Sequence, residues 1–292
     1  SKRNLKIFED SPFQAIKNLS HDVSDLKNFV DKIKPDLIII AGDRYDTLSG
    51  AVVSIPYNIP IIHFFGGAIT EGASDELVRH GITKMSHLHY VLLKEYADRL
   101  KRMGEEKWRI KQIGMPNLNN KLKLNFKNKK ELSSELKFNI NEPFALITFH
   151  PVTLDLKNTT KQVKNLIRAI KYTDLNVIIT YPNSDVKFNE IIKLYKKNFK
   201  NSHKLLITHS LGEKKYFNLM KYAKFILGNS SSGIVEAASF KLPAINLGDR
   251  QKGKYFPINV INSGYDYQDI LRAIKKVNTI SFQKRIKKMK NP

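Results

Sequence analysis

The amino-acid sequence predicts an α/β fold with two domains, each built on a parallel sheet. Three observations predict it. Short apolar runs alternate with longer amphipathic stretches, which is the pattern of strands joined by crossover helices. The apolar runs are continuous, as in strands that are buried on both faces and belong to parallel sheets covered by helices. One polar stretch rich in Lys and Asn interrupts the alternation, and a second series of strands follows it.

The first domain is expected to span 1–118. Its strands are predicted at 37–41, 60–65, 88–93 and 109–113. The first three are rich in Ile, Leu, Val or Phe and nearly free of charge, whereas the fourth contains Arg109 and Lys111 and is the weakest prediction.

The polar stretch 119–142 is interpreted as a linker, and 143–292 as the second domain. Strands of this domain are predicted at 144–149, 176–180, 204–207, 225–227 and 243–246. Open α/β sheets bind ligands at the carboxyl ends of their strands, so two such domains are expected to share a cleft lined by these ends.

The composition excludes several kinds of chemistry. Among the 292 residues there is no cysteine, which excludes disulfides, thiolate zinc sites, iron–sulfur clusters and cysteine nucleophiles. The sequence has no G-x-G-x-x-G after a strand and no G-x-x-x-x-G-K-[ST], so it offers neither a nicotinamide site nor a P-loop. His87 and His89 fall on a predicted strand and are interpreted as structural. No metal and no cofactor are expected.

The charge balance is strongly basic, with 50 Lys and Arg against 27 Asp and Glu and a formal net charge of +23. Because the basic residues are scattered over helix surfaces without interleaved stacking aromatics, we interpret them as a solvated surface that would attract a phosphorylated substrate, and expect no specific nucleic acid partner. No apolar run is long enough to span a bilayer, so no membrane partner and a cytoplasmic location are expected. The start at Ser1 and the ending KKMKNP indicate a chain cut at both ends.

Small and hydroxylated residues follow the predicted strand 225–227 in the run GNSSSG. At a strand-to-helix turn they leave backbone N–H groups open to a phosphate oxygen, and Ser230 and Ser231 are the expected contacts. The alternative is an ordinary N-cap, which needs one Ser. Glu236 follows inside the helical stretch, where a carboxylate can accept from sugar hydroxyls.

Further polar residues follow other predicted strands. In the first domain, GDRYD places Asp43 and Arg44 after the strand 37–41 as an acid or base and an anion clamp, with Asp43 as an N-cap as the alternative. His63 lies near a strand end before a Gly pair, and Asp75 and Arg79 share a helical face, as a simple ion pair would.

In the second domain, FHPVT places His150 after the strand 144–149 as an acid, base or phosphate partner, and YPNSD follows the strand 176–180. Such clusters at one edge of the sheets are hard to ascribe to separate structural causes.

These motifs together resemble a known family. The runs PDLIIIAGDRYD, PIIHFFGG, DELVRHGITKMSHLHYV, FHPVT, YPNSD and GNSSSGIVEAASFKLPAINLGDRQKGK are similar to those of the UDP-N-acetylglucosamine 2-epimerases, in particular the hydrolysing branch that feeds sialic-acid-type sugar synthesis. The resemblance covers most of the chain. It implies the glycosyltransferase-B arrangement, in which two Rossmann-like domains hold a UDP-sugar between them, and a homodimer or homotetramer.

The resemblance also implies a reaction without a redox cofactor. A base removes the proton at C2 while UDP leaves C1, and water then adds to the glycal to release N-acetylmannosamine. Asp43 and Asp75 match the acid/base carboxylates, and His150 would assist elimination. The positions implied to hold the sugar, the diphosphate, the ribose or the uracil are Arg44, His63, Arg79, Asn183, Asp185, His209, Ser230, Ser231, Glu236 and Arg250.

Two positions depart from the family pattern. Phe65 stands where members commonly carry Glu or His, and Ala68 where they carry Glu, so one acid/base group is missing. A catalytically impaired UDP-sugar-binding protein and a glycosyltransferase of the same fold therefore stay open beside the epimerase. The choice between UDP-N-acetylglucosamine and a UDP-2,4-diacetamido sugar also stays open.

Overall fold

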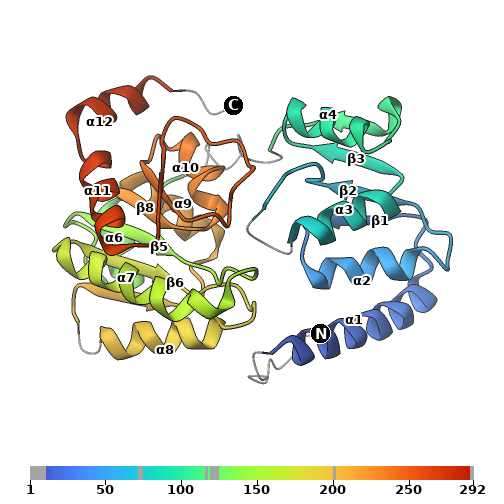
Figure 1. Ribbon diagram of the computed structural model, residues 1–292, viewed down its shortest axis with the longest axis horizontal. Coiled ribbons are helices and arrows are strands. Elements are labelled where there is room, and N and C mark those ends of the chain that lie inside the picture. Colours follow the sequence, from blue (N-terminus) through green and yellow to red (C-terminus); the bar gives the residue numbers. More distant parts are fainter. Residues whose placement is uncertain (1–10, 72–74, 116–117, 119–124, 200–201, 290–292) are drawn as a thin grey trace. The chain divides into compact units, whose positions relative to one another are not determined.

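The computed structural model describes residues 11–71, 75–115, 118, 125–199 and 202–289. The chain divides into two compact units, Ser1–Pro116 (unit 1) and Asn117–Pro292 (unit 2), each with its own sheet. In Figure 1, unit 1 runs from blue to green and unit 2 from green to red. Each unit is described by itself.

Unit 1 is a four-stranded parallel sheet with the strand order β1-β2-β3-β4. Its elements are α1 (Pro12–Ile33), β1 (Ile38–Ala41), α2 (Tyr45–Ser54), β2 (Ile61–Phe64), α3 (Asp75–Met85), β3 (Leu88–Val91), α4 (Lys94–Arg102) and β4 (Ile110–Gln112). Strands and helices alternate, so a helical crossover joins each strand to the next and all four strands run in the same direction.

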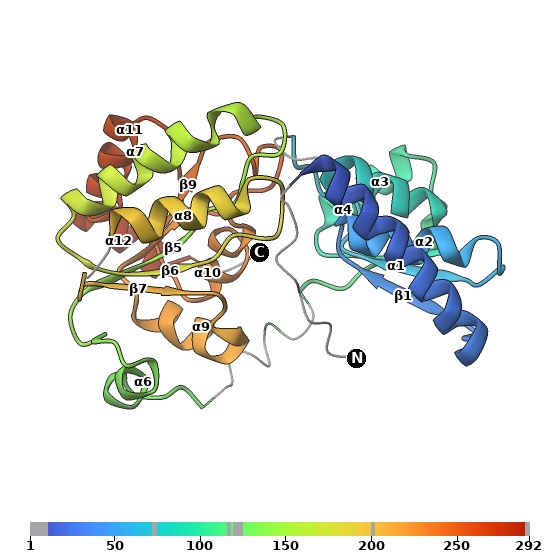
Figure 2. The ribbon, with the colours of Figure 1, turned by 90° about the horizontal axis from the view of Figure 1, so that it is seen from below.

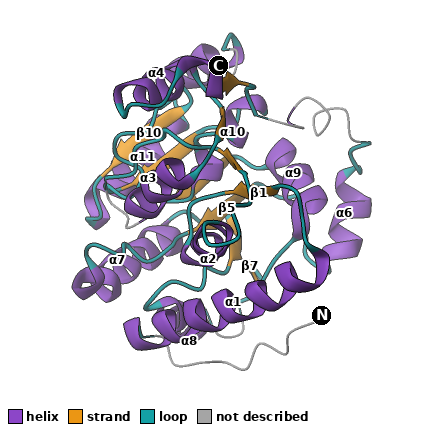
Figure 3. Cartoon of the chain, turned by 90° about the vertical axis from the view of Figure 1, so that its right-hand side faces the viewer, coloured by secondary structure: helices purple, strands orange, loops and turns teal. Residues whose placement is uncertain are grey.

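Helix α1 shows why these residues form these elements. The Ser11 hydroxyl caps it by accepting from the Gln14 N–H at 3.2 Å, and a proline at the first position has the φ that a helix needs. The helix packs beside α2, as Figure 3 shows, through Val30 against Val53 and Ile59. At the open edge of the sheet, Ile39 of β1 keeps 62% of its surface exposed.

Unit 2 is a six-stranded parallel sheet with the order β10-β9-β8-β5-β6-β7. Its strands are β5 (Phe144–Thr148), β6 (Asn176–Thr180), β7 (Leu205–Thr208), β8 (Phe225–Gly228), β9 (Ala244–Leu247) and β10 (Val260–Ser263). Its helices are α6 (Lys129–Leu136), α7 (Thr159–Tyr172), α8 (Phe188–Asn198), α9 (Gly212–Tyr222), α10 (Glu236–Ser239), α11 (Tyr267–Val277) and α12 (Ile280–Lys287).

Both faces of the unit 2 sheet are buried. Along β5, Ala145 and Ile147 join a core with α7, α8 and α11, while Phe144 and Leu146 join a core with α6 and α9. Figure 2 shows these two sets of helices on opposite sides of the strands. Successive side chains of a strand point to opposite faces, so a strand covered on both sides is apolar throughout. This is the physical origin of the continuous apolar runs. The prediction of parallel sheets is confirmed in both units, and burial on both faces is confirmed in unit 2.

All nine predicted strands form, and their ends differ from the predicted ones by at most two residues. The tenth strand, β10, was missed because its sequence VINS has only two apolar residues, and its pairing with β9 supplies the rest of the signal.

The stretch 119–142, predicted as a linker, belongs in its described part, 125–142, to unit 2. Asn128 and Glu131 form a capping box that starts α6. Leu132, Phe138 and Ile140 are buried in the core under α9. The polar residues that suggested a linker cover the outer side of this segment, and three apolar side chains anchor it.

Candidate active site

The strand order of unit 2 indicates where a ligand binds. From β5 the chain adds β6 and β7 on one side, then returns to place β8 on the other side of β5, followed by β9 and β10. The loops after β5 and β8 therefore leave the sheet in opposite directions. In open α/β sheets such a switch point is where the crevice for a ligand forms, outside the carboxyl ends of the strands. His150 and the GNSSSG run occupy these two loops.

His150 is held on its backbone by Asn229. The His150 N–H donates to Asn229 Oδ1 at 2.7 Å, and Asn229 Nδ2 donates to the His150 carbonyl at 2.8 Å. The ring is fixed as well, because the Asn183 N–H donates to His150 Nδ1 at 2.9 Å. Three neighbouring strands, β8, β5 and β6, thus combine to position one imidazole that is 6% exposed.

Close approach of two backbones makes the Asn229 contact possible. Gly228 ends β8 at φ 146°, and a Cβ there would lie 1.9 Å from the Thr148 carbonyl oxygen of β5. Only glycine fits both the conformation and the space. The sequence showed this glycine, but the reason for it comes from the neighbouring strand.

The GNSSSG run is a short turn. Ser230 Oγ accepts from the Ser232 N–H at 3.4 Å and caps a single 3₁₀ turn, which α10 follows. The N-cap interpretation of Ser230 is confirmed, and the helical stretch predicted after the run consists of these two short pieces. Ser231 is exposed, and a phosphate contact of either serine stays a prediction.

Tyr216 supports this turn from behind and was missed in the sequence. Its hydroxyl bonds with Ser232 Oγ at 2.9 Å, and Ser232 Oγ donates to Ser230 Oγ at 3.1 Å. Burial raises the pKa of Tyr216. Tyr216 lies on α9, far from the motif in sequence, so no local pattern reveals its role.

Arg250 is buried beside the loop that carries Asn229. It is 5% exposed, and its Nη1 donates to the Asn229 carbonyl oxygen at 3.3 Å, where Gln251 Nε2 also donates at 2.8 Å. Arg250 therefore stabilises the loop that carries the serines. Glu236, at the start of α10, is half-buried.

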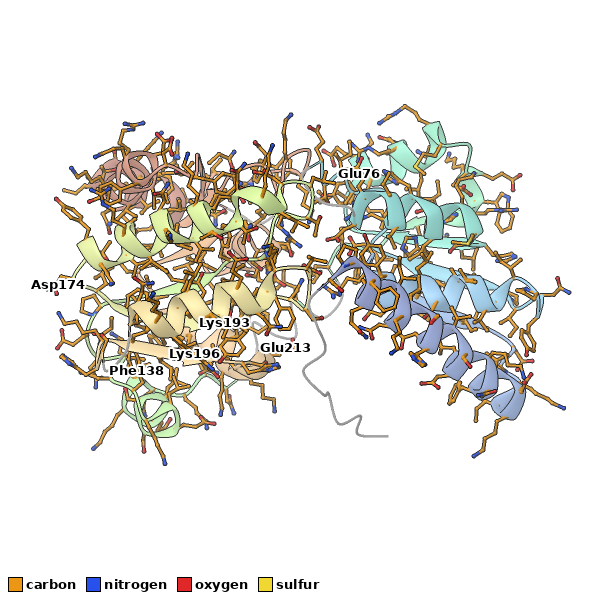
Figure 4. The ribbon with its side chains drawn as sticks, turned by 60° about the horizontal axis from the view of Figure 1, so that its bottom comes forward. Glu76, Phe138, Asp174, Lys193, Lys196 and Glu213 are labelled. Carbon is orange, nitrogen blue, oxygen red and sulfur yellow. The ribbon has the colours of Figure 1, made fainter. Side chains whose placement is uncertain are left out.

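The remaining predicted contacts of unit 2 follow β6 and β7, at the same edge. Asn183 and His209 are exposed and Asp185 is half-buried. The His209 ring lies edge-on to the Tyr181 ring with the centroids 5.7 Å apart, and Lys196 Nζ lies 5.9 Å from the same ring. Figure 4 labels Lys196 on α8. An exposed histidine beside an aromatic ring can contact a flat base.

In unit 1, the polar residues gather around Arg79. This guanidinium is 1% exposed and lies between the end of β1 and the segment after β2. Nε donates to Asp43 Oδ2 at 2.9 Å, and Nη2 contacts the same oxygen. Nη1 donates to the Ala68 carbonyl at 2.7 Å, and Nη2 to Thr70 Oγ1 at 3.0 Å. The Arg79 fork holds Asp43, whose side chain remains 29% exposed, and a contact between Arg79 and a substrate stays a prediction.

Asp43 is also not the N-cap of the following helix. That position belongs to Arg44, whose Nε lies 3.6 Å from the Asp46 carboxylate. Asp75 is the first residue of α3 and is half-buried, and its neighbour Glu76, labelled in Figure 4, accepts from the Thr70 N–H at 2.5 Å. Thr70 thus contacts both Arg79 and Glu76.

His63 also lies in the interior of unit 1. It is fully buried, with Nδ1 3.2 Å from Thr83 Oγ1 and Nε2 3.3 Å from the Gly42 carbonyl oxygen, to which it donates. Burial, with lesser effects from the neighbouring charges, lowers its pKa to about 4, so the ring is neutral at physiological pH. His63 contacts the turn that carries Asp43, and its contact with a substrate stays a prediction.

The two positions that depart from the family pattern lie in a constrained segment. Phe65 has φ 72°, a conformation rare for a bulky side chain, and is half-buried. Ala68 is 8% exposed and packs in an apolar cluster with Val91, Tyr96 and Leu100. Neither side chain can transfer a proton.

No helix among the described residues is long and apolar enough to cross a membrane. In the same part of the chain, no three His, Asp or Glu side chains group together as a metal ion would require.

Comparison with known proteins gives the family. The family model described as UDP-N-acetylglucosamine 2-epimerase matches residues 3–292. The chain belongs to this family. A Campylobacter jejuni protein named GDP/UDP-N,N'-diacetylbacillosamine 2-epimerase (hydrolyzing) is 40% identical over 283 residues, which cover 96% of this chain and 73% of that protein. The polysialic acid biosynthesis protein P7 of Escherichia coli is 32% identical over 292 residues, or 99% of this chain and 74% of that protein.

Solved structures agree on the fold. The UDP-GlcNAc 2-epimerase of Neisseria meningitidis bound to UDP-GlcNAc has a TM-score of 0.79 at 18% identity and covers 100% of this chain and 81% of that one. The Methanocaldococcus jannaschii enzyme in complex with UDP-GlcNAc and UDP has a TM-score of 0.76 at 21% identity, with 100% and 80% covered. The predicted fold class is confirmed.

Proposed function

We propose that this member of the 2-epimerase family is a hydrolysing UDP-sugar 2-epimerase, and that its sugar is a UDP-2,4-diacetamido sugar. The observation that carries the proposal is the 40% identity to a hydrolysing diacetylbacillosamine 2-epimerase over 96% of the chain. A second enzyme of that name, from Legionella pneumophila, is 32% identical over 89% of the chain. The edge of unit 2, with its turn of serines at a switch point, supports binding of the UDP part.

The proposed reaction has two stages. A carboxylate takes the proton from C2 of the sugar while the C1–O bond breaks and UDP leaves with the electron pair. Water then gives its oxygen to C1 and a proton returns to C2 from the opposite face, releasing the epimeric free sugar. Two faces need two acid/base groups, and Asp43 and Asp75 are the proposed pair. Asp43 suits this role because the Arg79 fork fixes one of its oxygens and leaves the side chain partly exposed.

Unit 2 supplies the binding of the leaving group in this proposal. Ser230 and Ser231 contact the diphosphate, Glu236 the ribose, and His209 the base beside Tyr181. His150 assists the departure of UDP, because an N–H donor stabilises negative charge on the phosphate oxygen as the bond breaks. We further propose that the enzyme is cytoplasmic and forms a homodimer or homotetramer. Light scattering tests the oligomeric state.

The test is proton NMR in D2O with UDP-N,N'-diacetylbacillosamine and, in a parallel tube, UDP-N-acetylglucosamine. The proposal expects free UDP and a C2-epimeric sugar with deuterium at C2 from the first substrate, at a higher rate than from the second. A preference for UDP-N-acetylglucosamine, giving N-acetylmannosamine, would overturn the proposed sugar. The proposed type of reaction would still hold.

The side chains at positions 65 and 68 favour a second candidate function, which is UDP binding without turnover. Neither Phe65 nor Ala68 offers an acid or a base, and a protein that lacks a needed group would bind UDP without turnover. Broadened UDP resonances with both substrates intact would establish that outcome. Asp43→Asn and Asp75→Asn then separate the two stages. The variant that lost the first base should release no UDP and leave no deuterium in the recovered substrate. The other variant should form UDP and the glycal without the epimeric sugar.

A further inference from the structure

We propose that His150 is held as the Nε2–H tautomer, and that Asn229 and the backbone N–H of Asn183 are the groups that position it for donating a hydrogen bond. This inference deepens the proposed function and rests on it for the role of His150 in the reaction. The tautomer itself can be measured without turnover. All the residues that carry it belong to unit 2.

The first step concerns the ring. The Asn183 backbone N–H, 2.9 Å from His150 Nδ1, can only donate. Nδ1 must therefore accept and carries no proton in this arrangement. A neutral imidazole with a bare Nδ1 has its single proton on Nε2. A proton on Nδ1 would set two N–H donors against each other and break the contact with the loop after β6.

The second step concerns the backbone. Asn229 is 0% exposed and bonds with both the N–H and the carbonyl of His150, at 2.7 and 2.8 Å. The pair of bonds fixes the residue in both translation and rotation. Asn229 is itself fixed, because its carbonyl oxygen accepts from Arg250 and Gln251. The loop after β8 thus fixes the backbone position of His150, and the loop after β6 fixes the orientation of its ring.

The chemical consequence is that His150 acts as a hydrogen-bond donor and not as the base that removes the C2 proton. With the proton on Nε2, His150 is prepared to donate to an anionic oxygen, such as a phosphate oxygen of departing UDP. It is not prepared to abstract the C2 proton from Nε2, because that nitrogen already carries one. Asn229 is a positioning residue that acts through His150, and the Asn183 backbone is a second.

The first measurement is the ¹⁵N NMR spectrum of the full chain, with the His150 signals identified by their loss in His150→Gln. The expected result is an unprotonated Nδ1 and a protonated Nε2, both before and after addition of UDP. Asn183→Ala keeps the backbone N–H and should keep this pattern, whereas Asn183→Pro removes the N–H and should shift it toward a mixture of tautomers. A protonated Nδ1 in the unaltered protein would overturn the proposal.

The second measurement compares two buried asparagines. Asn229→Ala should lower kcat roughly 10- to 100-fold with a smaller change in KM, because the donor is misplaced by a fraction of an ångström. Asn259 is equally buried and bonds with the Leu242 carbonyl at 2.8 Å, away from His150. Asn259→Ala is the control for lost stability and should keep kcat. Equal losses of kcat in both variants would overturn the positioning role of Asn229.

The two measurements also separate this inference from the proposed function. An Nε2–H tautomer that depends on the Asn183 N–H, found in a protein that turns over neither UDP-sugar, upholds the positioning and overturns the function. Turnover of a UDP-sugar by a protein with a protonated Nδ1 does the reverse.

Discussion

A single side chain, Arg79, organises the polar residues of unit 1. Its planar fork reaches Asp43, the Ala68 carbonyl and Thr70 at once. A lysine keeps the charge, but its single nitrogen cannot occupy the three separate positions from which the guanidinium nitrogens reach these partners. Because Arg79 is buried, each partner that it loses is left without compensation.

Arg79→Lys is therefore expected to lower the free energy of unfolding by about 2 kcal/mol and to reduce kcat by displacing Asp43. Urea denaturation and steady-state kinetics measure the two effects. Arg102→Lys is the matched control, because Arg102 is exposed at the end of α4. Identical behaviour of the two variants would contradict the role given to Arg79.

His63 makes the stability of unit 1 depend on pH. Its pKa is about 4 in the folded state, below the ordinary value near 6.5. Between these values the unfolded chain binds a proton that the folded chain refuses, so stability is complete above about pH 6.5 and falls as the pH drops toward 4. Protonation of His63 is expected to lower the free energy of unfolding by about 3 kcal/mol across this range.

Urea midpoints measured at several pH values between about 7 and 4 check this window. Burial also lowers the pKa of His89 and His80, which adds to the same slope, so the comparison must be between variants. His63→Gln should flatten the profile, whereas substitution of the exposed His203 should not. A profile unchanged by His63→Gln would contradict the assignment.

At this scale the sequence predicted which residues gather at the sheet edges, since parallel strands bring their carboxyl ends together. It did not predict which of them face solvent. His63, Arg79 and Arg250 are buried, and they bond with Thr83, Asp43 and Asn229, which lie 20 or more residues away in the sequence. Asn229 was overlooked beside the serines for the same reason, because its partner is 79 residues away.

At the scale of elements, the pairing of β5 with β8 is sensitive to a single added atom. A methyl group at Gly228 would collide with the Thr148 carbonyl oxygen at 1.9 Å and would require the unfavourable φ of 146°. Gly228→Ala is expected to lower the free energy of unfolding by roughly 2–5 kcal/mol, from strain and overpacking together.

Gly212→Ala provides a matched control for this variant. Gly212 also has a positive φ, 65°, but a Cβ there meets no atom within 4 Å. It should cost only the backbone strain, roughly 1 kcal/mol. Urea denaturation of both variants separates strain from collision, and equal losses would contradict the packing argument.

Elements were easier to predict than single residues because each carries several coincident signals. The strands were recognisable from apolar runs that two layers of helices require. Helix α6 was hidden, because its buried side is narrow: Leu132 alone is fully buried among eight residues, most of them polar. The strand β10 was hidden because it lies at an edge and its pattern is two residues long.

The two units differ in how completely they bury their apolar surface. Unit 2 has cores on both faces of its sheet. Unit 1 has three smaller clusters and leaves Ile39, Phe13 and Ile16 more than half exposed. Apolar surface of this kind promotes association.

Residues 117–292 expressed alone are therefore expected to fold cooperatively and to bind UDP, because the serine turn, His150 and His209 all belong to this unit. Residues 1–116 alone are expected to aggregate. Circular dichroism, light scattering and NMR titration with UDP check both statements. A soluble, cooperative unit 1 beside an unfolded unit 2 would contradict the difference drawn here.

The pairing of β5 with β8 also determines how late in folding the site around His150 can form. Ala145 lies beside Phe225 and His150 bonds with Asn229, so both contacts close loops of about 80 residues that contain β6 and β7. Closing such loops slows folding, because chain entropy is lost before the contacts form. During synthesis, β5 stays unpaired on the side of β8 until β6, β7 and β8 have left the ribosome. The imidazole is therefore oriented late, and a chain interrupted before β8 would expose an unpaired strand edge to its neighbours.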